Sequence, residues 1–451
     1  MIMMPAWSIE TPPMATAYLS AYLRSKKYDV NVFDFNLDLY KNIPSDKKYL
    51  FDGNRFSAWY PEDNFKQNIL EGLGFERFID GWAKQIIDKN MEVVCFSTYY
   101  SNYLSSLRLA QKIKQLDKNK TIIFGGPEAD RWEKGYEFIK KDFVDIVVVG
   151  EGELTLEKIL AAISGGNEIK NIKGVLCEEG GKLYDNKGVE IEDIDKIPFP
   201  NFEEFNLSDY IGKDILPILA SRGCISCCKF CSSWPFWKYR CRKAENVLEE
   251  IRYLKNRYGV KKFDIIDASI NGDCEQLNKL CDLLIRENIN IFWGGKANIR
   301  PEMTKEFLEK MYAAGCRWLS YGVESGSQRV VKDMGKNFDI ELAHEVLRNT
   351  FKVKIDIATF FIIGYPIETR RDFLKTLWFI IKNRKYIGSI SSGQKCGIPD
   401  SSILFQQASK YGIRFEKDGW HCGNNSPRER ELRHRVFKLV TKLISLKTLH
   451  T

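Results

Sequence analysis

Three cysteines with a distinctive spacing lie close together in one stretch of the chain. Cys224, Cys228 and Cys231 follow the pattern Cys-x3-Cys-x2-Cys. Three thiolates on one loop can bind three irons of a 4Fe–4S cluster and leave the fourth iron open for a ligand from outside the protein. Cys227 adjoins Cys228 and points elsewhere in an extended or turn conformation, so we do not expect it to be the fourth ligand. The spacing predicts an iron–sulfur site with one open coordination position.

Two other roles fit this cysteine cluster less well. Free cysteines are often small buried hydrophobic residues, but four cysteines within eight residues do not suit core packing. A zinc site needs a further Cys or His pair nearby, and the next cysteine is Cys241. No histidine precedes His344, which excludes a Ser-His-Asp site from that part of the chain. We expect core or incidental roles for the isolated cysteines, which are Cys95, Cys177, Cys274, Cys281, Cys316, Cys396 and Cys422.

The composition indicates a globular protein with more than one domain. Hydrophobic residues make up 44% of the 451 positions and charged residues 28%. The net charge of +8 is mild for this length, and we expect no nucleic-acid partner. No apolar run is long enough to span a membrane, and the N-terminus lacks the features of a secretion signal. We therefore expect a soluble, cytoplasmic protein, where disulfides are rare.

Residues 1–165 alternate short apolar runs with amphipathic helical patterns, which predicts a parallel sheet with crossover helices. Such sheets bind ligands beyond the carboxyl ends of their strands. Glycine there lets the backbone approach a ligand, and helix N-termini favour phosphate. Tight turns without a ligand are the alternative interpretation. The residues expected at these strand ends are Ser97, Thr98, Tyr99, Gly125, Gly126, Pro127, Gly150, Glu151 and Gly152.

A second series of strands and helices begins at Asp214. Six consecutive βα units, up to residue 395, predict a partly closed barrel with its chemistry at the carboxyl ends of the strands. Residues 166–213, between the two series, are interpreted as a linker that contains a hairpin around Glu179-Gly180-Gly181. Residues 396–451 are polar and then helical from Pro427 onward, which predicts a small, mostly helical C-terminal region.

The cysteine segment and the strands after it resemble the radical S-adenosylmethionine (SAM) enzymes. In that family SAM chelates the open iron, and the aromatic residue before the last cysteine lies against adenine. The segment Ser320–Gly326 resembles the family's Gly-x-Glu-Ser-Gly, and Phe361–Thr369 resembles its adenine-binding strand, with Ile367 in place of the glycine of Gly-Glu-Thr. Solvated strand-end carboxylates remain the alternative for Asp267 and Glu324. Beside the catalytic cluster ligands Cys224, Cys228 and Cys231, the implied SAM-binding residues are Phe230, Asp267, Ser269, Asn298, Ser320, Glu324, Ile362 and Ile363.

The N-terminal half resembles the cobalamin-binding (class B) members of that family. Pro12-Pro13 opens a segment similar to their Pro-Pro-Leu-Gly, and Ser97–Tyr99 stands 28 residues before Gly125-Gly126, as in the pair that surrounds the cobalamin nucleotide tail. The implied fold is α/β: a Rossmann-like cobalamin-binding domain at 1–165, then a partial (β/α)6 TIM-type radical SAM barrel at 214–395. The implied cobalamin-binding residues are Pro12, Pro13, Ser97, Thr98, Tyr99, Gly125, Gly126, Pro127, Gly150, Glu151 and Gly152.

The chain lacks the histidine with which many cobalamin domains bind cobalt from below. Those domains supply a histidine through Asp-x-His-x-x-Gly, whereas this chain has no histidine before His344. The resemblance then implies that cobalt is bound from below by water, by a group of the Thr98–Tyr103 loop, or by nothing.

The function implied first is methyl transfer to an unactivated carbon of a peptide or natural product, through a 5′-deoxyadenosyl radical and methylcobalamin. A non-methylating rearrangement or ring-forming reaction, and a non-catalytic cobalamin or iron–sulfur protein, are the alternatives. The resemblance also implies anaerobic conditions and an external low-potential electron donor of the flavodoxin or ferredoxin type, and we expect a monomer. The aromatic residues Trp234, Phe236, Trp237 and Tyr239 are candidates for lining a substrate pocket.

Overall fold

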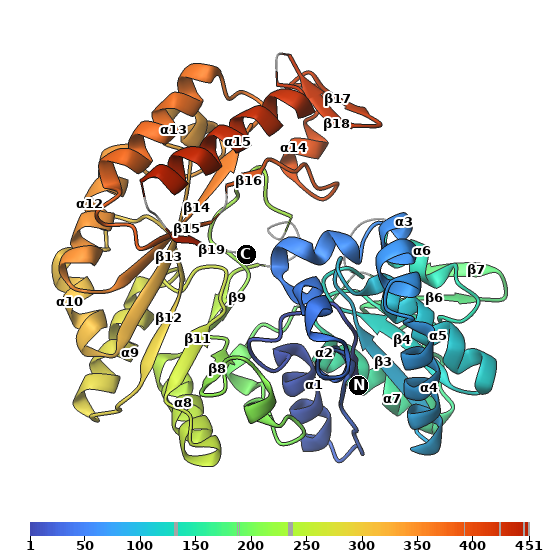
Figure 1. Cartoon of the computed structure of the whole chain (residues 1–451). Helices are drawn as coiled ribbons and strands as arrows, with labels where there is room; N and C mark the ends of the chain where they lie inside the picture. Colours follow the sequence, from blue (N-terminus) through green and yellow to red (C-terminus); the bar gives the residue numbers. More distant parts are fainter. Residues whose placement is uncertain are drawn as a thin grey trace. The chain divides into compact units, whose positions relative to one another are not determined.

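The computed structural model describes residues 1–129, 134–186, 188, 190–232, 238–391, 393–423, 425–444 and 447–449. The chain forms two compact units, Met1–Asp214 and Ile215–Thr451, coloured from blue to green and from green to red in Figure 1. Among the described helices, none is both long and apolar enough to cross a membrane.

The first unit is built on a sheet with the strand order β2-β1-β3-β4-β5-β6-β7, of which β1 to β5 are parallel. The order 2-1-3-4-5 is that of a doubly wound fold, which binds ligands where the order reverses, between β1 and β3. The parallel strands are β1 (Ile2–Met3), β2 (Phe33–Asp34), β3 (Val93–Ser97), β4 (Thr121–Gly125) and β5 (Ile146–Val148).

Helices cover the two faces of this sheet because the side chains of each strand alternate between them. On β4, Ile122 and Phe124 join a large apolar cluster with Trp82, whereas Ile123 joins a smaller cluster with Ile159. The α-helices of this unit are α1 (Met14–Ser25), α2 (Phe35–Asn42), α3 (Glu62–Asn64), α4 (Glu76–Asp88), α5 (Tyr103–Leu116), α6 (Lys134–Ile139) and α7 (Gly152–Gly165). The 3-10 helices η1 (Ser45–Phe51) and η2 (Gly53–Ala58) and the π-helix η3 (Phe65–Glu71) lie between α2 and α4.

The hairpin predicted within a linker belongs to the first sheet. Strands β6 (Val175–Glu179) and β7 (Lys182–Asp185) are antiparallel, and β6 pairs with the otherwise open edge of β5. The rest of the segment also packs in this unit, where the Tyr210 hydroxyl donates to Asp34 at 2.5 Å. The described residues of 166–213 are thus folded onto the first unit, because the backbone of β6 pairs with the edge of β5.

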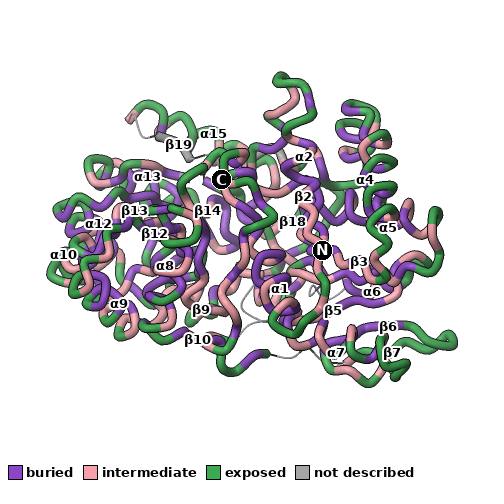
Figure 2. Tube along the Cα trace, turned by 90° about the horizontal axis from the view of Figure 1, so that it is seen from below, coloured by how far each residue is buried: buried purple, intermediate pink, exposed green. Residues whose placement is uncertain are grey.

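The second unit contains a parallel sheet in the order β15-β14-β13-β12-β11-β8, which confirms the predicted α/β fold class. Buried and exposed residues alternate along the covering helices (Figure 2). Its strands are β8 (Ile215–Ile218), β11 (Lys262–Ile265), β12 (Phe292–Ala297), β13 (Cys316–Glu324), β14 (Asp356–Ile363) and β15 (Ser389–Ser391). Its helices are α8 (Ala244–Tyr258), α9 (Cys274–Arg286), α10 (Lys305–Ala313), α11 (Gln328–Asp333), α12 (Ile340–Lys352) and α13 (Arg370–Asn383).

The C-terminal region contains strands as well as the predicted helix. A short helix α14 (Ile403–Gln406) precedes an antiparallel hairpin, and α15 (Pro427–Leu443) follows it. The expectation of a mostly helical region misses these strands because they have only two to four residues, too few to show a period of two. The strands are β16 (Gln394–Lys395), β17 (Ile413–Glu416), β18 (Gly419–Cys422) and β19 (Lys447–Leu449).

Candidate functional site

The three predicted cluster cysteines lie on a loop just beyond the carboxyl end of β8. The loop starts at β9 (Ser221–Arg222) and turns tightly, since the Cys231 amide donates to the Cys228 carbonyl at 3.0 Å. Cys228 is buried, Cys224 and Cys231 are half-buried, and Cys227 is exposed. The exposed position of Cys227 agrees with the expectation that its thiol points elsewhere.

The three predicted cluster cysteines do not form a closed single-ion site in the described residues. The Sγ atoms of Cys224, Cys228 and Cys231 are not all within 4.8 Å of one another. Burial raises the pKa of the Cys228 thiol to about 12, with smaller contributions in the same direction from Glu324 and from the other two cluster cysteines. Metal binding would displace this proton.

A buried ion pair lies beside the cysteines, at the end of β13. The Glu324 carboxylate is 3.1 Å from the Lys336 ammonium group, and the two side chains are 10% and 9% exposed. Lys336 also donates to the Gly322 carbonyl at 3.2 Å, and against the effect of burial it lowers the pKa of Cys228. Ser320 is half-buried on the same strand face as Glu324. Glu324 is therefore not a solvated carboxylate, and Lys336 is a site residue that no sequence motif revealed.

Asp267 holds the start of the cysteine loop. Its two oxygens accept from the Ala220 amide at 2.8 Å and from the Ser221 hydroxyl at 2.6 Å. Burial raises the pKa of Asp267 to about 6, although these hydrogen bonds act in the opposite direction. Asp267 as a whole is 2% exposed, so the solvated alternative does not apply to it either. Its contact with the SAM amine stays a prediction.

Ser269 and Asn298 belong to one hydrogen-bonded group that reaches the cysteine loop. The Asn298 amide donates to the Ser269 hydroxyl at 3.0 Å and to Ser226 of the loop at 3.5 Å. The fully buried Asn271 joins them, because its carbonyl oxygen accepts from Ser269 at 2.8 Å and from the Asn298 backbone at 2.9 Å. Sequence reasoning missed Asn271, which follows a strand without a recognisable motif.

Phe230 and Ile362 lie in the same apolar cluster of the second unit. This agrees with a shared role at adenine, whose flat ring suits an apolar slot. Ile363 faces the opposite side of β14, because side chains alternate along a strand. It is fully buried, and its carbonyl accepts from the Cys396 amide at 2.8 Å. Only one of the two predicted isoleucines can therefore present its side chain to the same ligand as Phe230.

The turn after β14 is a helix start as well as a candidate adenine segment. Thr369 and Asp372 form a capping box at the beginning of α13. Glu368 is buried and ion-paired with Arg433 of α15 at 2.8 Å. Ile367, which stands where the family pattern has glycine, directly precedes Glu368, and both interactions are present beside it.

In the first unit, the predicted cobalamin-binding residues of β3 and β4 meet at the carboxyl edge of the sheet. The Thr98 hydroxyl and amide donate to the Gly125 carbonyl at 2.8 and 2.7 Å. A Cβ on Gly126 would lie 2.8 Å from the Thr98 carbonyl oxygen, and the φ of +96° also demands glycine. The Tyr99 ring stacks on Trp7 with centroids 3.9 Å apart. Backbone contacts and the stacked Tyr99 and Trp7 rings therefore form a close-packed edge of the sheet.

Asn102 joins the ends of β1 and β3, where the strand order reverses. Its side chain donates to the Met4 and Ser97 carbonyls at 3.3 and 3.2 Å and accepts from the Tyr99 amide at 2.7 Å. The nearby Ser101 hydroxyl donates to the Ala6 carbonyl at 2.7 Å. These groups of the Thr98–Tyr103 loop are thus engaged with the backbone. Sequence reasoning did not single out Asn102.

The other predicted cobalamin-binding residues lie next to helix starts. Pro12 and Pro13 directly precede α1, and Gly150–Gly152 leads into α7. Glu151 is buried, and its carboxylate accepts from the Ile191 amide. This bond gives Glu151 a structural role in fixing the segment after the hairpin.

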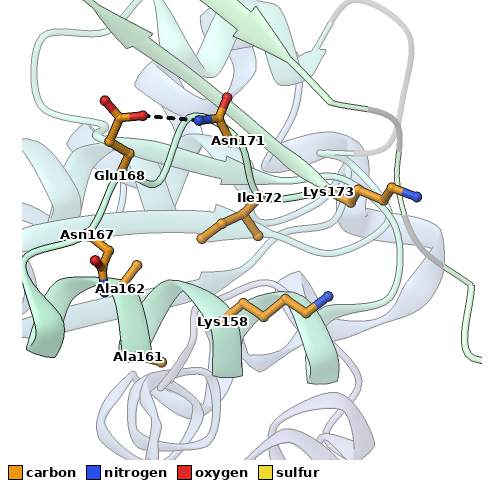
Figure 3. A pocket seen from close by; sticks show the side chains of 8 residues that line it. All are labelled: Lys158, Ala161, Ala162, Asn167, Glu168, Asn171, Ile172 and Lys173. Carbon is orange, nitrogen blue, oxygen red and sulfur yellow. Dashed lines mark hydrogen bonds between the residues drawn. The ribbon is translucent and has the colours of Figure 1, made fainter.

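Three of the candidate pocket residues, Trp234, Phe236 and Trp237, lie outside the described residues. Tyr239 packs against the turn after β11, where a Cβ on Gly272 would lie 2.6 Å from its hydroxyl. An open hollow of 470 Å³ lies beside the C-terminal half of α7 and the segment that follows it (Figure 3). It is lined by Lys158, Ala161, Ala162, Asn167, Glu168, Asn171, Ile172 and Lys173.

Comparisons with known proteins match both halves of the chain. Residues 218–380 match the model of the radical SAM superfamily, and residues 61–160 match that of the B12 binding domain. An uncharacterized methyltransferase of Pyrococcus horikoshii is 27% identical over 70% of this chain and 69% of its own length. The cytidylyl-2-hydroxyethylphosphonate methyltransferase of Streptomyces wedmorensis is 24% identical over 79% and 69%. Further relatives are named as anaerobic magnesium-protoporphyrin IX monomethyl ester cyclases and methylthiotransferases.

The fold is also found among solved structures. A radical SAM methyltransferase of Kitasatospora setae, solved with cobalamin and a 4Fe–4S cluster, has a TM-score of 0.64 at 14% identity. The similarity covers 90% of this chain and 78% of the other. At this identity the likeness concerns the fold, and it includes both units.

Proposed function

The chain belongs to the B12-binding radical SAM enzymes, whose cofactors are a 4Fe–4S cluster, SAM and cobalamin, and we propose that it is a methyltransferase. The proposed substrate is an unactivated carbon of a peptide or small natural product. The observation that carries the proposal is that one chain contains both a three-cysteine loop and a B12-binding domain. The relatives of this chain include two methyltransferases. In our proposal, an external flavodoxin- or ferredoxin-type protein supplies electrons.

The chain's own residues hold and orient the cofactors. When bound, the cluster, SAM and cobalamin supply radical formation and methyl carriage. Cys224, Cys228 and Cys231 would bind three irons, and the loop is held in place by Asp267. Phe230 would offer an aromatic face to adenine. In the first unit, Ser97–Tyr99 and Gly125–Gly126 would hold a nucleotide tail at the carboxyl ends of β3 and β4.

The test is anaerobic reconstitution with iron, sulfide and hydroxocobalamin, followed by reduction in the presence of SAM carrying a deuterated methyl group. Mass spectrometry then follows 5′-deoxyadenosine and the label on extracted cobalamin. We expect close to four irons and one cobalt per chain, 5′-deoxyadenosine, and deuterated methyl on cobalamin. A protein that binds both cofactors but leaves SAM intact would contradict an enzymatic role.

The cyclase relatives favour a second candidate, a cobalamin-dependent reaction without net methylation. One such cyclase, from Cereibacter sphaeroides, is 27% identical over 52% of this chain and 40% of its own length. The same experiment separates the two, because a non-methylating enzyme forms 5′-deoxyadenosine without moving the label to cobalamin.

A further inference from the structure

A group of polar side chains outside the predicted SAM contacts surrounds Lys229, which lies between two of the cluster cysteines. Its ammonium group donates to the Tyr411 hydroxyl at 2.7 Å and lies 3.3 Å from Asp333 Oδ1. The Tyr411 and Tyr365 hydroxyls both donate to Asp333 Oδ2, each at 2.9 Å. One carboxylate at the end of α11 therefore joins the cysteine loop, the end of β14 and the C-terminal region.

The main chain of Lys229 is held as well as its side chain. Its amide donates to the Met334 carbonyl at 3.0 Å, just beyond α11, and its carbonyl accepts from the Leu404 amide of α14 at 2.9 Å. A residue with its amide, carbonyl and ammonium group all bonded has little freedom to rotate. The direction of the next residue, Phe230, is fixed in consequence.

The polar group and the apolar cluster share side chains. The ring of Tyr365 is a buried member of the cluster that contains Phe230 and Ile362, and the ring of Tyr411 packs against it. Their hydroxyls point out of the cluster to Asp333. Loss of the Tyr411 hydroxyl would therefore remove polar contacts that hold Lys229, and with it Phe230, without removing a ring from the apolar cluster.

We propose that Tyr411, acting through Lys229 and Asp333, is a positioning residue for the adenine of SAM. It holds Phe230 at a fixed distance from Ile362, so that the apolar slot for the base exists before SAM binds. A preformed slot costs less conformational entropy on binding than one that must be ordered. The proposal rests on SAM binding by this family and is independent of methyl transfer.

The test compares two Tyr→Phe variants of the reconstituted full chain. Tyr411→Phe removes a hydroxyl from the group around Lys229. Tyr321→Phe is the matched control, because its hydroxyl is fully buried in the same unit and lies 3.0 Å from Thr350 of α12, on the outer face of the sheet. We expect equal iron contents, and SAM binding about tenfold weaker in Tyr411→Phe only, which corresponds to about 1.4 kcal/mol. Equilibrium dialysis measures the affinity.

A second pair of variants tests the route through the loop. Lys229→Met should weaken SAM binding at least as much as Tyr411→Phe, and Lys229→Arg should recover part of it, because guanidinium keeps the charge and the donors. The electron paramagnetic resonance spectrum of the reduced cluster should respond less to added SAM in Lys229→Met and Tyr411→Phe.

Three outcomes are adverse. The inference would be overturned if Tyr411→Phe kept its irons and bound SAM with wild-type affinity. It would also be overturned if Tyr411→Phe lost iron in parallel with SAM binding, because the polar group would then support the cluster and not the adenine slot. If the wild-type enzyme itself fails to bind SAM, the proposed function falls and this inference falls with it.

Discussion

At the scale of single residues, neighbouring cysteines of identical chemistry have different environments. Cys228 is buried beside Lys336, whereas Cys227 is exposed. We expect Cys228→Ala to lose most of its iron and all SAM cleavage, because the two remaining thiolates cannot hold a cluster firmly. Cys227→Ala is the control and should keep close to the wild-type iron content. Iron and sulfide analysis, together with the absorption spectrum, measures the cluster content of each variant. Equal iron in both variants would refute the ligand assignment.

Asp267 gives a pH-dependent prediction. Its folded-state pKa of about 6 lies above the ordinary value of 3.8, chiefly because it is buried. The folded state therefore binds this proton more tightly, and the contribution of Asp267 to the free energy of unfolding falls as pH rises from about 4 to 6, by an amount on the order of 3 kcal/mol. Asp267→Asn should lack this fall. Urea unfolding of the cofactor-free protein at several pH values measures it, and parallel profiles for both proteins would contradict the assignment.

Sequence patterns pointed to some of the residues of the candidate site and missed others. Spacing singled out Cys224, Cys228 and Cys231 as candidate cluster ligands, because all three lie on one short loop. Spacing could not identify Lys336 or Asn271, which reach the site through the folding of distant segments. These two side chains act through burial and hydrogen bonds, and neither property leaves a local pattern.

At the scale of elements, the edge formed by β3 and β4 depends on close approach of the backbone. Gly126→Ala would place a Cβ 2.8 Å from the Thr98 carbonyl oxygen at a φ of +96°. We expect a loss of about 1–3 kcal/mol in the free energy of unfolding and weaker cobalamin binding. Gly74→Ala is the control, since its φ is +58° with nothing within 4 Å. It should cost about 1 kcal/mol from backbone strain alone and leave cobalamin affinity unchanged.

Long elements were predictable and short ones were not. The strands of the second unit and α15 follow clear apolar periods, so the sequence pattern located them. The pairing of β6 with β5 and the hairpin β17–β18 depend on which edges remain open after the rest has folded. Such pairing is a tertiary property, and the pattern of a few residues does not contain it.

At the scale of the whole molecule, the predicted contacts of each cofactor come from one unit alone. The cysteine loop and its supports lie in the unit Ile215–Thr451, and the β3–β4 edge lies in Met1–Asp214. We expect independent loading, because residues without shared partners contribute additively. Cys228→Ala should lower the iron content and leave cobalt at one per chain. Gly126→Ala should lower the cobalt content and leave the iron content unchanged. In the double variant, the loss of each metal should equal its loss in the corresponding single variant. Parallel metal and cobalamin analysis of the four proteins gives the answer. Loss of cobalt in Cys228→Ala would instead mean that cobalamin binding requires the loaded barrel.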